Sequence, residues 1–223
     1  MPMPPIKHTT CGAVLALWLT ASSLAQPAPP ALDPAQGAEI GARYQAWLSP
    51  HQEGGEEKDT PAAVPRAFRS TTPSVNREQR PSRGHGMLRF SKDLSRAYVD
   101  IRIEGVDPKT INMFHIHCGK PGILGPILVD FGHKTDLKAA FAGNTFSAVV
   151  RNEDLVAVTA HSQGLIGFAT AGCPILAANP FDRVKTVAGM AAIAREGELY
   201  FNLHTTGQSY FGDIRGQLDM VRD

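Results

Sequence analysis

The sequence has no excess of charge of either sign and few aromatic residues. Its 223 residues include 22 Lys and Arg against 21 Asp and Glu, a formal net charge of +1, and only 7% of them are aromatic. The charges are scattered, without the basic cluster that attracts nucleic acid or an anionic membrane surface. We therefore expect no nucleic-acid partner. The 21 Gly and 17 Pro residues argue against a long helical or coiled-coil protein.

Motifs of several enzyme classes are also missing. The chain has Ser, His and Asp residues, but it has no nucleophile-elbow motif, no Gly-rich phosphate loop and no paired-carboxylate pattern. These absences exclude the common hydrolase, kinase and dinucleotide-binding classes. We assign no catalytic residue, favour a binding role over catalysis and leave enzymatic activity open.

The longest apolar run lies near the N-terminus and is short. Residues 11–19 (CGAVLALWL) follow Lys7, and residues 23–25 (SLA) place small side chains at the two cleavage-site positions. Nine apolar residues are too few to span a bilayer, which takes ~20, so we expect no transmembrane segment. We predict that residues 1–25 are a signal peptide and that the protein is exported to the periplasm or the extracellular space.

Cysteine is scarce, with three residues of which one lies in the predicted signal peptide. The other two are Cys118 and Cys173, and an oxidising compartment favours a disulfide between them. Two buried free thiols, or a metal-binding thiolate at Cys118, are the alternatives. We favour the disulfide, because thiolates outside the cytosol rarely stay reduced.

Two parts of the mature chain have compositions that build little core. Residues 26–42 begin with a stretch rich in Pro and Ala, typical of a flexible leader. Residues 54–83 are polar and contain four prolines, and we predict a long disordered insert there. Apart from this insert, we expect residues 43–223 to form one β domain.

Short strands dominate this domain. In residues 96–104 (RAYVDIRIE) apolar and polar side chains alternate, which indicates a half-buried strand. Further strands are expected at residues 44–48, 87–90, 111–117, 127–131, 145–150, 199–204 and 214–221, and helices at 152–161 and 181–195. Repeated short strands of this kind predict an all-β fold, an antiparallel sandwich or barrel decorated by one or two short helices.

The sharpest local pattern is the histidine pair in residues 114–117 (FHIH). Side chains alternate along a strand, so His115 and His117 project to one face. In residues 200–204 (YFNLH) the same alternation places His204 opposite the apolar Phe201 and Leu203. If these two strands are neighbours, three imidazoles share a surface and can bind one metal ion at a distance of ~2 Å.

Other histidines are candidates for further ligands. His85 stands between two glycines at the entrance to a strand, His51 follows the first predicted strand, and His133 lies in a turn, where a solvated role is favoured over ligation. Imidazole ligands without an ordered set of carboxylates favour copper or zinc over calcium or magnesium, which prefer oxygen. Histidine pairs on a strand also occur without a metal.

Two longer segments resemble a known family. HIHCGKPGILGPILVDFG (115–132) and ELYFNLHTTGQSYFGDIRGQL (198–218) are similar to the CHRD domain family, named for chordin, whose hallmarks are HIH followed by G-x-x-G-P, then Y-x-N-x-H-T and G-E-I-R-G-Q. YQAWLSPHQE (44–53) also resembles the family's opening strand. The polar insert and the cysteine pair depart from the family pattern. The matching residues of the second segment are Tyr200, Asn202, His204, Thr205, Gly212, Ile214, Arg215, Gly216 and Gln217, with Asp213 where the family usually has Glu.

The resemblance implies an immunoglobulin-like β-barrel in a secreted protein. In animal chordins such domains accompany growth-factor-binding modules. The HxH strand is also similar to the copper-binding Phe-His-Val-His strand of Cu/Zn superoxide dismutases, where His115 and His117 would correspond to two copper ligands and His133 to the bridging histidine. A second histidine pair with an aspartate for zinc is missing, so a copper-only site is the one that this similarity supports.

Three functions remain open: an exported domain that binds a transition metal, with copper favoured; an extracellular protein-interaction module without a metal; and a copper redox enzyme like superoxide dismutase. Within the family turn at residues 212–217, Arg215 either steers an anion toward a cation site or, with Asp213, bridges strand ends and satisfies backbone carbonyls. We favour the structural role for Arg215, because Arg in such positions most often serves to position other groups.

Overall fold

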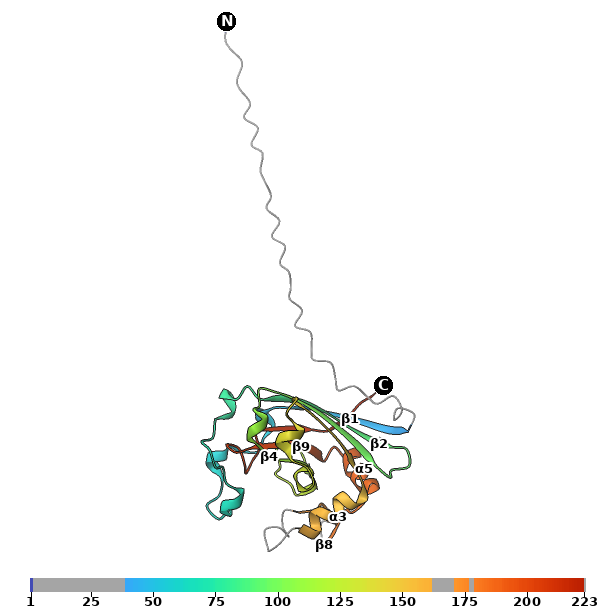
Figure 1. The fold of residues 1–223 in the computed structure, drawn as a ribbon. Coiled ribbons are helices and arrows are strands. Elements are labelled where there is room, and N and C mark those ends of the chain that lie inside the picture. The colour runs from blue at the N-terminus through green and yellow to red at the C-terminus, as the bar shows by residue number, and fades with distance from the viewer. Residues whose placement is uncertain (2–38, 162–170, 177–178, 223) are drawn as a thin grey trace.

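Two antiparallel β-sheets face each other in the computed structural model of the chain (Figure 1). The structure describes residue 1 and residues 39–161, 171–176 and 179–222. The first sheet has the strand order β11-β1-β2-β3-β6, and the second has the order β10-β9-β4-β5. This arrangement confirms the predicted all-β sandwich. The predicted signal peptide lies outside the described residues apart from Met1, as does most of the predicted leader.

The chain passes back and forth between the two sheets after groups of one to three strands. The first sheet contains β1 (Ile40–Leu48), β2 (Arg83–Ser91), β3 (Ala97–Glu104), β6 (Thr145–Val150) and β11 (Asp219–Met220), and the second contains β4 (Ile111–Cys118), β5 (Ile127–Asp130), β9 (Leu199–Thr205) and β10 (Ile214–Gln217). A separate pair consists of β7 (Pro174–Leu176) and β8 (Asn179–Arg183), and the helices are α2 (Leu137–Ala140), α3 (Asn152–His161) and α5 (Val187–Arg195). No helix within the described ranges is long and apolar enough to cross a membrane.

An aromatic cluster fills the space between the sheets. Phe114 of β4 lies at its centre, with ring centroids 4.9, 5.6, 5.4 and 5.8 Å from those of Phe131, Phe141, Phe146 and Phe201. Each buried ring stabilises the fold by roughly 2 kcal/mol relative to exposure. Because Phe114 points into this core, the flanking side chains of β4 point to the other face of the second sheet.

The C-terminal part of the domain differs from the expected element boundaries. Residues 179–183 form β8, so the helix expected from residue 181 begins only at Val187. Thr186 sets this boundary, because its hydroxyl accepts a hydrogen bond from the backbone N–H of Gly189 and caps α5. The strand expected over 214–221 is divided, with β10 pairing with β9 in the second sheet and β11 pairing with β1 in the first.

The polar insert has a defined course instead of the expected disorder. Residues 54–83 contain three short 3₁₀ helices and lie along one edge of the domain, where Figure 1 shows them in teal. The buried carboxylate of Glu57 accepts hydrogen bonds from the backbone N–H groups of Tyr210 and Phe211 and from the hydroxyl of Ser70. The segment contributes little apolar core, as its composition predicts, but its polar groups bind the loop between β9 and β10.

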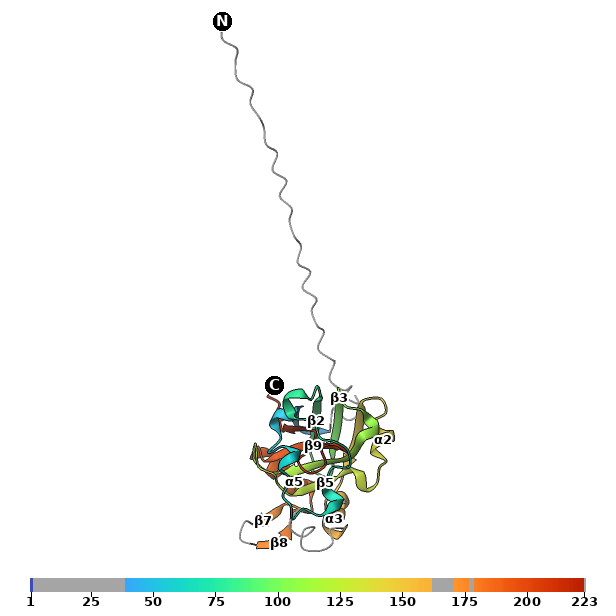
Figure 2. The ribbon, with the colours of Figure 1, turned by 90° about the vertical axis from the view of Figure 1, so that its left-hand side faces the viewer.

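The predicted disulfide between Cys118 and Cys173 is present, with a Cα–Cα distance of 6.0 Å. It joins the end of β4 to the residue before β7. Two views at right angles place α3 and β8 below the two sheets (Figures 1 and 2). The disulfide therefore holds the end of the histidine-bearing strand against this lower part of the domain.

Candidate metal centre

Three histidines converge on the face of the second sheet that points away from the aromatic core. β4 and β9 are neighbours, with His115 opposite Asn202 and Met113 opposite His204. One nitrogen from each of His115, His117 and His204 lies within 4.8 Å of the other two. All three side chains are buried, with exposed fractions of 3%, 5% and 3%. The alternation read from the sequence places these three residues correctly.

Backbone carbonyls fix the protonation pattern of two of the rings. Nδ1 of His117 lies 2.8 Å from the carbonyl oxygen of Gly125, and Nδ1 of His204 lies 3.0 Å from that of Ser209. A carbonyl oxygen only accepts, so each Nδ1 carries the hydrogen and each Nε2 keeps its lone pair. Both Nε2 atoms are buried and have no hydrogen-bond partner among the described residues.

His115 has the complementary arrangement. Its Nε2 lies 3.6 Å from the carboxylate of Asp130, which is opposite it on β5, while its Nδ1 is buried without a partner in the described part of the chain. Each of the three rings thus faces an oxygen with one nitrogen and leaves the other nitrogen unused. Histidine ligands of metals show this pattern, because an outer oxygen orients the ring and makes its ligating nitrogen more basic.

The environment keeps the three rings neutral. Burial lowers the pKa of His117 to about 3 and that of His204 to about 4, and it lowers the pKa of His115 well below its usual value. Mutual repulsion between the rings lowers the pKa of His115 and of His117 further. Only neutral imidazole binds a metal, so at neutral pH the three side chains are in the form that ligation needs.

The donor set suits a borderline transition metal. Nitrogens that bind one ion at about 2 Å lie closer together than 4.8 Å, the distance within which the three ring nitrogens lie here. The rings must therefore approach one another by about 1 Å to share an ion. Three imidazole nitrogens fit copper or zinc, and a three-ligand site leaves at least one position for a further ligand.

Tyr200 and Arg215 support His117 from beside the cluster. The ring of Tyr200 stacks on that of His117 at 4.9 Å between centroids, and the guanidinium of Arg215 lies 3.5 Å from the centroid of Tyr200. Arg215 is 1% exposed and donates hydrogen bonds of 2.8 Å to the carbonyls of Lys120 and Ile123. These contacts confirm that Arg215 satisfies backbone carbonyls instead of facing an ion.

Gly125 brings the loop between β4 and β5 close to His117. Its backbone N–H donates to the hydroxyl of Tyr200 at 3.0 Å, while its carbonyl accepts from His117. A Cβ at this position would lie 1.6 Å from the carbonyl oxygen of Cys118. Only glycine permits this approach, which accounts for the G-x-x-G-P spacing after the histidine pair.

The other motif residues hold the loop that carries Ser209. Asn202 donates to the carbonyl of Phe211, and the Thr205 carbonyl accepts from the Ser209 hydroxyl. Asp213 accepts hydrogen bonds from Arg80 and Ser82 of the insert. These residues therefore position the carbonyl that orients His204, a supporting role that the sequence motif alone did not reveal.

The remaining candidate histidines lie elsewhere. His85 is on β2 of the first sheet and packs against Trp47, with 4.3 Å between the ring centroids. Because its neighbours Gly84 and Gly86 face the core, His85 faces outward. His51 is exposed and lies 3.2 Å from Glu78, and His133 is exposed after β5. The structure brings none of them to the three-histidine cluster, and Cys118 is held in the disulfide.

A cavity of about 340 Å³ adjoins the three histidines. The polar insert forms one side of this cavity, a role that the sequence analysis did not predict. The apolar Val64 and Phe68, inside an otherwise polar segment, are the signal that could have indicated this role. The lining residues are Pro61, Ala63, Val64, Pro65, Phe68, Met113, His115, His117, Leu124, Gly125, Ile127, His204, Ser209 and Tyr210.

Comparison with known proteins gives one match. The family model described as CHRD domain matches residues 68–218, which is more than half of the chain and includes all three clustered histidines. No curated protein and no solved structure matches the chain.

Proposed function

Since the chain belongs to the CHRD domain family, we propose that it is an exported protein, periplasmic or extracellular, that binds one transition-metal ion, with copper favoured over zinc. His115, His117 and His204 supply the ligands. The observation that carries the proposal is the convergence of three buried imidazoles, with one nitrogen of each within 4.8 Å of the others, together with one buried nitrogen on each ring that has no hydrogen-bond partner in the described chain.

The energetic cost of burying ring nitrogens without hydrogen-bond partners supports this role. A buried polar atom without a partner costs about 1–3 kcal/mol, and each of the three clustered rings has one. One ion would satisfy all three at once. Copper is favoured because divalent copper has the highest affinity for nitrogen ligands in the first transition series.

Two features support export. Residues 1–25 have the composition of a signal peptide. The disulfide between Cys118 and Cys173 is typical of oxidising compartments such as the periplasm and the extracellular space.

Of the two alternatives, superoxide dismutase-like catalysis has less support. An enzyme that draws in an anion uses positive charge near its site to speed the encounter. The residues that line the cavity include no Lys or Arg, and Arg215 is occupied by backbone carbonyls. The second alternative, a protein-interaction module without a metal, makes the opposite prediction for metal titration.

Titration of the mature chain, residues 26–223, with Cu(II) and Zn(II) tests the proposal. We expect one ion per chain and nitrogen-ligated copper by EPR in the wild type. The variant His115→Ala/His117→Ala is expected to lose the ion, while the matched control His51→Ala/His133→Ala, which removes two exposed histidines, keeps it. Equal binding by both variants, or no binding by the wild type, overturns the proposal. A superoxide assay on the loaded protein separates binding from catalysis.

A further inference from the structure

We propose that the metal ion takes a small phenolate as an additional ligand, with the oxygen on the ion and the aromatic ring in the adjoining cavity. This inference rests on the proposed metal binding and adds the chemical class of the molecule that binds there. The arguments are the size and lining of the cavity, the charge of the metal centre and the small number of polar groups in the wall.

The cavity has the size and lining of a small-molecule site. Its volume of about 340 Å³ lies in the range of ligand pockets, roughly 300–1,000 Å³, and a space of about 150 Å³ already accommodates benzene. Apart from the histidines, its wall is mainly aliphatic and aromatic, with Val64, Phe68, Met113, Leu124 and Ile127 as the largest apolar contributors. Such a wall favours an apolar ring.

The few polar groups of the wall are largely occupied. The hydroxyl of Ser209 donates to the carbonyl of Thr205 and accepts from the side-chain amide of Asn112, and the Ser209 carbonyl accepts from His204. The backbone carbonyl of Gly125 is similarly taken by His117. A polar atom of the ligand therefore finds its strongest partner at the metal.

The charge of the centre selects an anion. A divalent ion on three neutral imidazoles brings two positive charges into a buried site, and the carboxylate of Asp130, 3.6 Å from His115, offsets one of them. The lining residues contain no Asp or Glu that would offset the other. A buried charge needs a counter-charge, so a monoanionic ligand is favoured. The phenol hydroxyl supplies it by releasing its proton to solvent.

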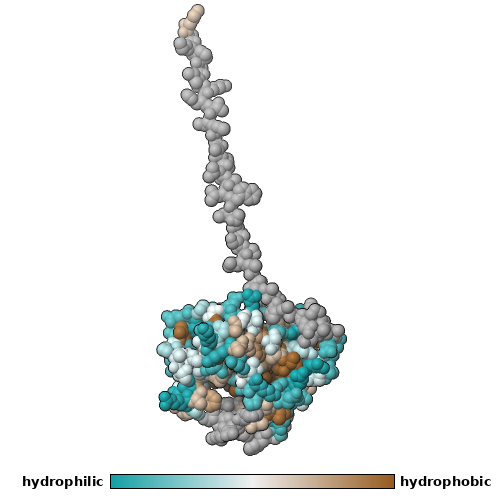
Figure 3. All heavy atoms as spheres, in the orientation of Figure 1, coloured by the Kyte–Doolittle hydropathy of each residue, from teal (hydrophilic) through white to brown (hydrophobic). Residues whose placement is uncertain are grey.

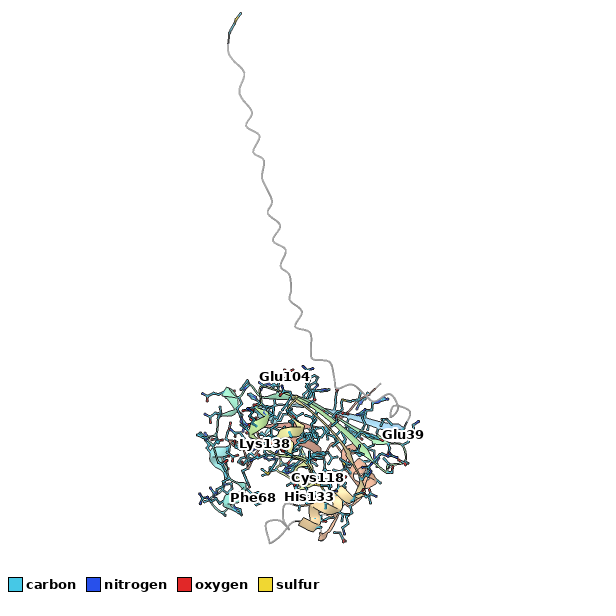
Figure 4. The ribbon with its side chains drawn as sticks, in the orientation of Figure 1. Glu39, Phe68, Glu104, Cys118, His133 and Lys138 are labelled. Carbon is cyan, nitrogen blue, oxygen red and sulfur yellow. A yellow bond between two sulfur atoms is a disulfide. The ribbon has the colours of Figure 1, made fainter. Side chains whose placement is uncertain are left out.

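Two of the large apolar lining residues are exposed at the surface, and we place the entrance between them. Phe68 is 44% exposed and Leu124 is 41% exposed. Figure 4 shows Phe68 at the edge of the domain, away from the two sheets. On the face drawn in Figure 3, apolar patches lie among hydrophilic residues. A ring that enters between Phe68 and Leu124 meets apolar surface before it reaches the histidines.

Titration of the copper-loaded mature protein with 4-methylphenol tests the inference. Phenolate coordination to Cu(II) produces a charge-transfer band in visible light and changes the copper EPR spectrum. Azide, a monoanion without a ring, serves as the comparison ligand. The variants Phe68→Ala and Leu124→Ala each remove apolar wall without touching a metal ligand. Val75→Ala is the matched control, because Val75 is 45% exposed in the same insert and does not line the cavity.

We expect the band to appear at saturation and each wall variant to bind 4-methylphenol about tenfold more weakly, since loss of apolar contact in a pocket has roughly this effect. Azide affinity and copper affinity should stay at the wild-type value in all variants, and Val75→Ala should match the wild type throughout. Copper binding without the band, or equal affinity in wall variants and control, overturns the phenolate inference and leaves the metal proposal standing. Absence of copper binding overturns both.

Discussion

Acidification should destabilise the metal-free protein through its three clustered histidines. Their pKa values are lowered by burial in the folded state, to about 3 for His117 and about 4 for His204, whereas unfolded histidine titrates near 6.5. The unfolded chain therefore binds more protons between these values. The stability contributed by the neutral rings is complete above pH 6.5 and is lost as the pH falls toward the folded pKa.

The size of this destabilisation follows from the difference between the pH and the pKa of histidine in the unfolded chain. At pH 5 the unfolded state gains about 2 kcal/mol from protonating each histidine, or about 6 kcal/mol for all three, while the folded rings stay neutral. That is comparable to the whole stability of an ordinary domain, about 5–15 kcal/mol. Metal-free protein should accordingly unfold on mild acidification.

Urea denaturation of the metal-free protein at pH values from 8 to 5 measures this effect. His117→Gln should lose about 2 kcal/mol of the pH dependence, and His115→Gln/His117→Gln/His204→Gln about 6 kcal/mol of it. Burial also raises the pKa of Glu53, and this contribution cancels because it is common to all variants. The exposed His51→Gln serves as the control. A wild-type pH dependence equal to that of the triple variant would refute the assignment of buried neutral rings.

Three further perturbations probe the support of the site. Glu57→Ala leaves the partly buried N–H donors of Tyr210 and Phe211 unpaired and should reduce the free energy of unfolding by about 3 kcal/mol. The exposed Asp59→Ala should cause almost no change, and equal urea midpoints for the two variants would contradict this prediction. Arg215→Met leaves the backbone carbonyls of Lys120 and Ile123 without their donor and removes no metal ligand. It should weaken copper binding about tenfold in competition titrations, and an unchanged copper affinity would argue against a positioning role for Arg215. Reduction of the disulfide should lower stability by about 4 kcal/mol, and free thiols by mass spectrometry in the untreated protein would exclude it.

The histidine cluster was predictable because it depends on strand alternation and on neighbouring strands. Alternation places His115 and His117 on the face opposite Phe114, and places His204 opposite Phe201, whatever the rest of the chain does. The same rule gives the buried face of β1, where Tyr44, Ala46 and Leu48 point inward as expected.

The position of the polar insert, which forms one side of the cavity beside the histidines, was not predictable from the local sequence pattern. The insert lacks the apolar periodicity of an element. Its position depends on single long-range hydrogen bonds, such as those that the backbone N–H groups of Tyr210 and Ser209 donate to Glu57 and Ser70. His85 lies apart from the three-histidine cluster for a related reason: sequence does not show which sheet a strand joins, and β2 joins the first sheet.

Pulsed EPR of copper bound to ¹⁵N-histidine-labelled protein tests the central claim most directly, because it counts the imidazole nitrogens on the ion. We expect three nitrogens and one copper per chain in the wild type. The variant His204→Ala should show two nitrogens and weaker binding, while His85→Ala should match the wild type. A nitrogen count that His204→Ala leaves unchanged, or that His85→Ala reduces, would contradict a metal centre formed by His115, His117 and His204.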